Sequence, residues 1–162
     1  MMLILMVFLV SVSFAGCKTG NQPNQDNSTQ TTDVLDKQSV TNQVTGFGNN
    51  LSMVSLQAPN EEVSKNIQQY YSPYVSEQLL IAWQQDPRKA PGRLVSSPWP
   101  DHIDVLSTTK VSADTYEVKG EIIYLTNVEK ANGGAAAKNP VTLLVKKYDN
   151  RWLIDQVNIN QQ

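Results

Sequence analysis

The sequence contains a single cysteine, Cys17, and a single histidine, His102, among its 162 residues. One cysteine allows no disulfide within the chain, and one residue of each kind is too few for a zinc site built from cysteines and histidines. The formal net charge is only −2. Because nucleic-acid-binding proteins usually present a strongly basic face, we do not expect this protein to bind nucleic acid.

Motifs for common cofactors are also missing. The glycine-rich stretch from Gly133 to Lys138 is not a phosphate-binding loop, because Ala137 precedes Lys138 and Asn139 follows it, where such a loop needs Gly and then Ser or Thr. The sequence has no GxSxG nucleophile motif and no clustered Asp and Asn run for calcium. We therefore expect neither a cofactor nor a metal.

The chain begins with an apolar segment that carries no charge. Residues 1–14 hold little that is polar beyond Ser11 and Ser13, and the small residues Ala15 and Gly16 follow. This run is shorter than the roughly 20 residues of a transmembrane helix. Its length and the small residues after it are typical of a secretory signal and its cleavage site. We predict a signal peptide over residues 1–16.

Phe14-Ala15-Gly16-Cys17 resembles the lipobox of bacterial lipoproteins. In that family the cysteine sulfur carries a diacylglycerol and the mature chain begins at the cysteine. The resemblance implies lipid attachment at Cys17 and a place on the extracytoplasmic face of the cell membrane, with the membrane itself as a partner. A diacyl anchor would hold the protein by more than about 20 kcal/mol. The alternatives are a free secreted protein and an uncleaved apolar terminus.

The segment after Cys17 is polar and lacks any large apolar residue up to Asp33. Such a segment has nothing to bury that offsets the entropy lost on ordering. We predict a lipidated flexible tether over residues 17–33, followed by one folded domain over residues 34–162. That domain is long enough to bury roughly two-thirds of its unfolded surface.

The first half of the domain has the spacing of helices. Apolar residues at Val40, Val44, Phe47, Leu51 and Val54 fall three or four apart, as on one face of a helix. Two glycines, Gly46 and Gly48, indicate either a bend or a close approach of another backbone. Two shorter helices follow, with Asn60 and Ser76 as the predicted N-caps.

The second half has the alternation of strands. We predict strands over residues 93–96, 102–110, 116–124, 141–148 and 152–159, with a bulge or bend at Gly120 and a hairpin turn at Asp149-Asn150. Residues 97–101 are predicted to be a loop, as are residues 129–140. Helices followed by an antiparallel meander indicate an α+β domain, with N-terminal helices packed on a curved antiparallel sheet of about four strands.

This order of elements resembles the NTF2-like fold, also called the cystatin-like cone. The closing hairpin from Lys146 to Asp155 looks like the C-terminal signature of that family. The resemblance implies helices wrapped by a curved sheet, with a concave face that holds a ligand. Members of the class include both enzymes and accessory binding domains of envelope machines.

The candidate catalytic residues are His102, Asp101 and Asp104. An imidazole beside a carboxylate is the minimum for general acid and base work near neutral pH. Their position at a junction of loop and strand is equally typical of turn and surface residues. Both interpretations stay open at this point.

The candidate ligand-binding residues are Trp99, Arg93 and Tyr124. Trp99 stands between two prolines in a predicted loop, where ordinary core packing is less expected. Arg93 is a candidate partner for an anionic ligand. The first hypothesis is a non-catalytic binding module of the cell envelope, whose concave face takes an envelope protein or a small apolar ligand. The alternative is a small NTF2-like enzyme, of the isomerase or hydrolase type, that uses His102 with Asp101 or Asp104. The pattern predicts no particular oligomeric state.

Overall fold

A computed structural model of the chain describes residues 25–160. The first half is helical, and its elements are α1 (Gln25–Gly48), the 3-10 helix η1 (Leu51–Met53), α2 (Asn60–Tyr71), α3 (Glu77–Gln85) and the 3-10 helix η2 (Pro87–Lys89). The second half contains β1 (Trp99–Ser112), β2 (Thr115–Leu125), α4 (Asn127–Asn132), β3 (Ala137–Tyr148) and β4 (Arg151–Ile159). The predicted α+β class is confirmed.

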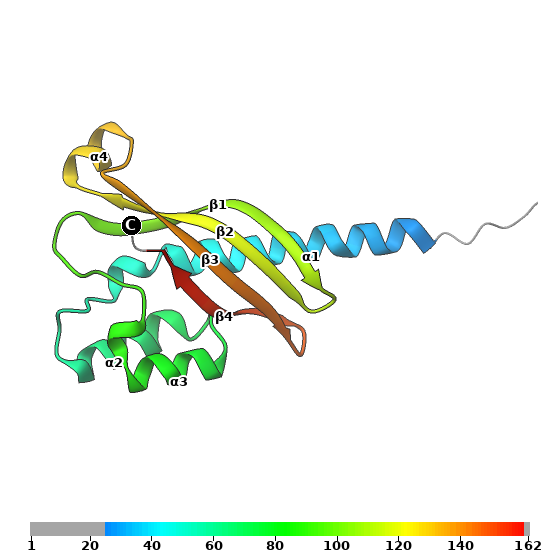
Figure 1. Ribbon diagram of the computed structural model, residues 1–162, viewed down its shortest axis with the longest axis horizontal. Helices are drawn as coiled ribbons and strands as arrows, with labels where there is room; N and C mark the ends of the chain where they lie inside the picture. Colours follow the sequence, from blue (N-terminus) through cyan, green and yellow to red (C-terminus); the bar gives the residue numbers. More distant parts are fainter. Residues whose placement is uncertain (1–24, 161–162) are drawn as a thin grey trace, which may run out of the picture.

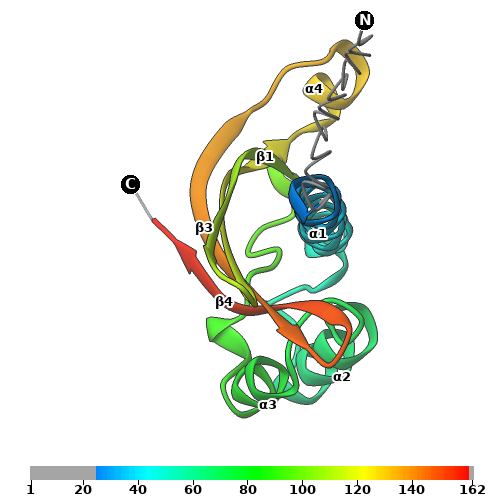
Figure 2. The same cartoon turned by 90° about the vertical axis from the view of Figure 1, so that its right-hand side faces the viewer.

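The four strands form one antiparallel sheet in the order β1-β2-β3-β4, so each strand pairs with its neighbour along the chain. The sheet bends around α1, which lies along its concave face, while α2 and α3 lie together at the β4 side (Figures 1 and 2). The segment between α2 and α3 is joined to the edge of β4, because Ser76 N donates to Ile154 O at 2.8 Å and Ile154 N donates to Tyr74 O at 2.9 Å. These bonds satisfy part of the β4 edge.

The core forms between α1 and the concave face of the sheet. The five apolar residues whose spacing predicts the first helix are all fully buried, at 0% exposure: Val40, Val44, Phe47, Leu51 and Val54. Phe47 also contacts Tyr71 and Trp83, with ring centroids 4.8 and 6.1 Å away. The aromatic rings of α2 and α3 therefore join the same core as α1.

Helix α1 differs from its prediction at both ends. It begins at Gln25, so residues 25–33 of the predicted tether are helical, and it ends at Gly48, before Leu51 and Val54 of the predicted helical face. The physical reason for the early start is contact with the sheet: Asp33 pairs with Lys110 at 2.6 Å, and Asp36 pairs with Lys147 at 3.3 Å. Because this part of the helix is held by polar contacts, its sequence shows no apolar periodicity that would predict a helix.

Two of the predicted glycine effects are confirmed. A Cβ on Gly48 would lie 2.7 Å from the backbone nitrogen of Ile103, so this glycine permits a close approach of α1 to β1. Gly120 pairs with Val105, next to a register shift between Val105 and Ser107 on β1. Its own Cβ would lie 2.6 Å from Asp104 O. Both glycines bring backbones closer than a side chain allows.

The predicted caps and loops were partly wrong. Ser76 caps α3 as predicted, with its side chain accepting from Leu79 N at 3.3 Å. Helix α2, however, starts at Asn60 itself, and Pro59 occupies the cap position. The predicted loop of residues 129–140 contains much of α4, which is closed by a capping box between Thr126 and Glu129, and the start of β3. Residues 93–96 form no strand, and only a single bridge joins Arg93 to Ser55.

Candidate functional site

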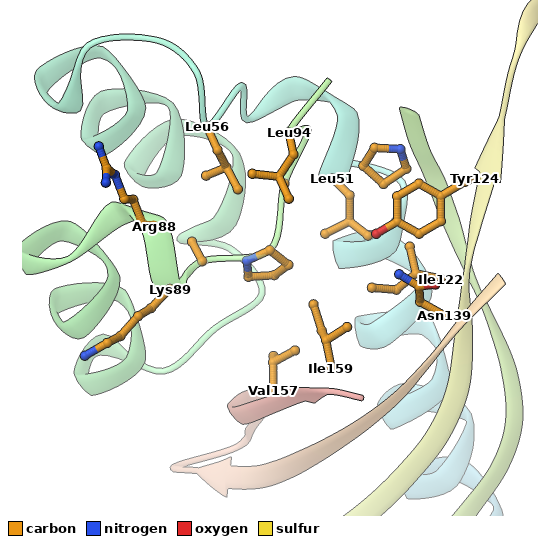
Figure 3. A pocket seen from close by; sticks show the side chains of 14 residues that line it. Leu51, Leu56, Arg88, Lys89, Leu94, Ile122, Tyr124, Asn139, Val157 and Ile159 are labelled. Carbon is orange, nitrogen blue, oxygen red and sulfur yellow. The ribbon is translucent and has the colours of Figure 1, made fainter. Parts of the chain in front are cut away.

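A cavity of about 550 Å³ opens between the concave face of the sheet and the segment that runs from η1 to residue 94 (Figure 3). Its volume falls within the roughly 300 to 1,000 Å³ of small-molecule sites. Most of the residues that line it are apolar: Leu51, Leu56, Ala90, Pro91, Gly92, Leu94, Pro100, Ile122, Val157 and Ile159. Four others are polar or charged: Arg88, Lys89, Tyr124 and Asn139. By residue type the lining is mostly apolar, but the surface it exposes is more polar than apolar, because Leu51 and Ile122 are buried whereas Arg88 and Lys89 are exposed.

The sheet wall of the cavity follows from strand alternation. Ile122 and Tyr124 are two apart on β2, so they share a face, and Asn139 on β3 pairs with Ile122. On β4 a register shift leaves Asp155 as an extra residue, because Leu144 pairs with Gln156 and Val145 pairs with Ile154.

The extra residue at Asp155 re-aims the end of β4. Ile154 is buried in the core, and strand alternation without the shift would turn Val157 to the opposite face. With the shift, Val157 and Ile159 share the face of Ile154 and pack against the core. The bulge therefore supplies two apolar side chains to the cavity.

The opposite wall is an extended segment held by three hydrogen bonds. Arg93 N donates to Val54 O at 2.8 Å, and Leu56 N donates to Arg93 O at 2.9 Å. The buried Tyr71 hydroxyl donates to Pro91 O at 2.7 Å. Gly92 is required where the two segments meet, because a Cβ there would lie 2.6 Å from Val54 O. The backbone of residues 91–93 is therefore held by the segment of residues 54–56 on one side and by Tyr71 of α2 on the other.

Tyr124 and Asn139 supply polar groups to the apolar interior. In Figure 3 the Tyr124 hydroxyl is directed toward the neighbouring side chain of Leu51. Burial raises the pKa of Tyr124 above its ordinary value of 10.0, and a hydrogen bond with the Asn139 side chain opposes this rise only in part. The phenol is consequently neutral at physiological pH and able to donate a hydrogen bond.

The three predicted ligand-binding residues have different places. Tyr124 lines the cavity. Arg93 lies between two lining residues and Trp99 precedes one, Pro100, but neither of them lines the cavity itself. The predicted loop at Trp99 was wrong, because Trp99 is the first residue of β1 and pairs with Leu125. Its ring has the ammonium of Lys130 at 5.9 Å from the ring centroid. A cation over a partly exposed aromatic ring is a weak interaction, and it does not identify Trp99 as a ligand-binding residue.

The candidate catalytic residues lie together on the other face of the sheet. His102 Nδ1 is 2.8 Å from Asp101 Oδ2, and His102 Nε2 is 3.2 Å from Asp104 Oδ1. Strand alternation explains the direction of His102. Ile103 is buried in the core, so the residues on either side of it, His102 and Asp104, face away from the core. About a third of the His102 side chain, 35%, is exposed, and His102 does not line the cavity.

Within residues 25–160, no cluster of three His, Cys, Asp or Glu side chains is suitable for a metal ion. In the same part of the chain, no helix combines the length and the hydropathy needed to cross a membrane. Cys17, the predicted site of lipid attachment, lies outside the described residues.

Most of the cavity was missed by sequence reasoning. Leu56, Leu94, Val157 and Ile159 read as ordinary apolar residues, and no local pattern distinguishes a side chain that lines a cavity from one that fills the core. The basic pair Arg88-Lys89 was also missed, although two adjacent cations after Asp86-Pro87 are visible in the sequence. Only the fold brings this pair to the rim of the cavity.

No protein-family model matches the sequence, and a search of curated proteins finds no match. Among solved structures, the chain is similar to an NTF2-like protein of unknown function from Shewanella oneidensis, with 14% identity, a TM-score of 0.41, and coverage of 76% of this chain and 98% of the other.

Two structures from Bacteroides are also similar to the chain. A protein of unknown function from Bacteroides thetaiotaomicron has 15% identity and a TM-score of 0.40, covering 83% of this chain and 98% of the other. A DUF4783 family protein from Bacteroides ovatus has 17% identity and a TM-score of 0.35, covering 72% of this chain and 88% of the other. Likeness at this level carries nothing about function.

Proposed function

We propose that the protein is a non-catalytic binding module of the cell envelope, and that the cavity against Ile122 and Tyr124 is its binding site. The observation that carries the proposal is the cavity of about 550 Å³ between the sheet and the η1–η2 side, in which ten of the 14 lining residues are apolar. Such a chamber buries the apolar part of a small ligand, and one or two fixed polar groups orient it.

The composition of the lining supports binding over catalysis. The 14 lining residues include no Asp, Glu, His, Cys or Ser, and Tyr124 is kept neutral by burial. General acid and base chemistry near neutral pH uses groups whose pKa lies close to the working pH. Tyr124 and Asn139 are suited instead to hydrogen bonding with a bound molecule.

Binding can be tested with the neutral fluorescent probe Nile red. Leu94 lines the cavity and is 61% exposed, so Leu94→Arg places a charge at the cavity with little disturbance of the core. We expect this variant to bind Nile red at least about tenfold more weakly, because the probe would have to bury or displace the charge.

The matched control is Leu106→Arg. Leu106 is 66% exposed on β1 and does not line the cavity, so this variant should bind the probe as the unmodified protein does. Equal binding by all three proteins, or no saturable binding by any, would overturn the cavity as the binding site.

The second part of the proposal is the anchor at Cys17. It is supported by the sequence Phe14-Ala15-Gly16-Cys17 and by the uncharged segment before it. We expect the protein in the membrane fraction with two ester-linked acyl chains on a mature N-terminal cysteine, as read by mass spectrometry. Cys17→Ser should abolish the acyl mass, whereas Ser13→Ala should retain it. An unlipidated Cys17 in the unmodified protein would refute the anchor.

The rival function is a small enzyme of the isomerase or hydrolase type built on His102. It is favoured by one observation, the two carboxylates of Asp101 and Asp104 on the two imidazole nitrogens. The cavity lies on the other face of the sheet, so an enzyme of this kind would have to hold its substrate on the open outer face. Loss of a measured turnover in His102→Ala would favour this rival.

A further inference from the structure

Two positive charges stand at one end of the cavity, and both come from η2. Arg88 and Lys89 are the charged residues among those that line the cavity, and both are exposed. In Figure 3 they lie at the end away from Tyr124, and their charged ends point outward from the apolar interior. The cavity therefore has an apolar interior and a basic rim.

Arg88 is available to a ligand, and Lys89 is partly so. Lys89 is 3.3 Å from Asp86, in a pair whose side chains are 76% and 48% exposed. Such an exposed pair is weak and exchanges readily with other anions. Arg88 has no ion pair within the described part of the chain. Its guanidinium presents several N–H donors in a planar fork, which matches the two oxygens of a carboxylate.

The basic rim is fixed in place by the fold. Pro87, at the start of η2, is buried, and the backbone of η2 closes with Ala90 N donating to Pro87 O at 3.2 Å. Pro91 follows, held by the Tyr71 hydroxyl at 2.7 Å. The long side chains of Arg88 and Lys89 thus move from a fixed base, and an arginine or lysine stem can lie along apolar surface while its charge stays in water.

We propose that the ligand is an anionic amphiphile, a single acyl chain with a carboxylate head. The chain would lie against the partly exposed side chains of Leu56, Val157 and Ile159, and the carboxylate would lie at the rim beside Arg88 and Lys89. This proposal rests on the proposed binding function of the cavity and adds the chemical class of the ligand. Charge complementarity is the reason: both charged residues that line the cavity are positive, and the nearby carboxylate of Asp86 pairs with Lys89 without lining the cavity.

Tyr124 and Asn139 lie away from the rim, at the far end of the chamber. They offer hydrogen bonds to an oxygen on the chain, so an oxygenated acyl chain would fit better than a plain one. A purely apolar ligand would leave both groups without a new partner, although their bond to each other persists. The head and the chain of the ligand are thus recognised at opposite ends.

The test uses isothermal titration of the full chain carrying Cys17→Ser with decanoate, decanol and decylamine. These probes share one chain and differ in the charge of the head. We expect decanoate to bind roughly three- to tenfold more tightly than decanol, as two partly exposed ion pairs allow, and decylamine to bind most weakly. Rising salt should remove the advantage of decanoate because exposed charges are screened. Each CH₂ added to the chain should tighten binding about fourfold until the cavity is full.

The variant that isolates the rim is Arg88→Gln with Lys89→Gln. Both side chains are exposed, so we expect the double variant to fold as the unmodified protein does, as read by circular dichroism. It should bind decanoate no better than decanol and leave decanol unchanged. The matched control is Arg93→Gln, since Arg93 is a cation in the same segment that does not line the cavity. It should retain the preference for decanoate.

The outcomes separate the two proposals. If decanol binds as tightly as decanoate, or if the double variant weakens the binding of both equally, the proposed carboxylate ligand is overturned, whereas the cavity remains the binding site. Tighter binding of decylamine overturns it as well. If none of the probes binds and Nile red does not saturate, both the ligand class and the binding function fail. If only Arg93→Gln loses the preference for decanoate, the carboxylate binds at Arg93, and its proposed position beside Arg88 and Lys89 is overturned.

Discussion

The hydroxyl of Tyr116 donates a hydrogen bond to the carboxylate of Asp33, 2.9 Å away across 83 positions of the chain. The same carboxylate pairs with Lys110 at 2.6 Å. One turn further along α1, Asp36 accepts from the indole nitrogen of Trp152 at 3.1 Å. The first half of α1 is therefore attached to the sheet by polar contacts, whereas its second half is attached by apolar packing.

The Asp33 contact predicts a stability that depends on pH. The pKa of Asp33 lies below its ordinary value of 3.8, first because Lys110 donates to the carboxylate and then because Tyr116 does. A lowered pKa means that the contribution is present above the unfolded value and is lost as the pH falls through the folded value. We expect Asp33→Asn to lower the midpoint of urea unfolding at pH 7, and this difference to shrink below about pH 4.

The control for the Asp33 experiment is Asp149→Asn, at the exposed hairpin turn. Asp149 has a φ of 54°, a conformation that Asn adopts readily, so this change should leave the midpoint nearly unaltered at every pH. A difference for Asp33→Asn that stays constant down to about pH 3 would contradict the role of the charged carboxylate.

A methyl group at Gly48 should separate α1 from β1. The added Cβ would lie 2.7 Å from the backbone nitrogen of Ile103 and 2.9 Å from its Cβ, so one of the two elements must shift. We expect Gly48→Ala to lower the free energy of unfolding by about 1 to 3 kcal/mol, as overpacked substitutions do. Thr45→Ala, on the exposed side of the same helix, is the control, and chemical denaturation is the measurement. Equal stability of the two variants would show that the approach is looser than the distances indicate.

The Tyr71 hydroxyl should matter for both stability and the cavity. Tyr71 is fully buried, and burial raises the pKa of its phenol, so it remains a donor to Pro91 O. Tyr71→Phe leaves that carbonyl without its donor, which typically costs about 1 to 3 kcal/mol. Since Pro91 lines the cavity, binding of Nile red should weaken as well. The half-buried Tyr70 of the same helix supplies the control, Tyr70→Phe, which we expect to change neither property.

His102 should be dispensable for binding. It lies on the face of the sheet away from the core, between Asp101 and Asp104. We expect His102→Ala to change the free energy of unfolding by no more than about 0.5 kcal/mol, as is usual for surface positions. The affinity for Nile red should stay the same in a fluorescence titration. Weaker binding in this variant would connect the two faces of the sheet and favour the rival function.

Apolar periodicity was sufficient to predict the core side of α1. Val40, Val44 and Phe47 were recognised from their own spacing, which places them on one face of the helix. Leu51 and Val54 are buried as well, but they lie beyond the end of α1 at Gly48. The four strands and the hairpin at Asp149-Asn150 followed from alternation and turn residues in the same way. By contrast, the start of α1 depends on Asp33 and Asp36, whose partners are remote in sequence, so no local pattern predicted it.

The chain by itself thus determined the class of the fold, the buried side of the second half of α1 and the one candidate ligand residue that does line the cavity, Tyr124. These follow from local periodicity, which a sequence displays directly. Tertiary structure alone decided that Arg88 and Lys89 meet the same chamber as Val157 and Ile159, and that His102 lies on the other face. A cavity forms where elements that are distant in the sequence pack together incompletely. The extra residue at Asp155 turns the side chains at the end of β4 toward this cavity. Such gaps and register shifts arise only when distant segments pack together.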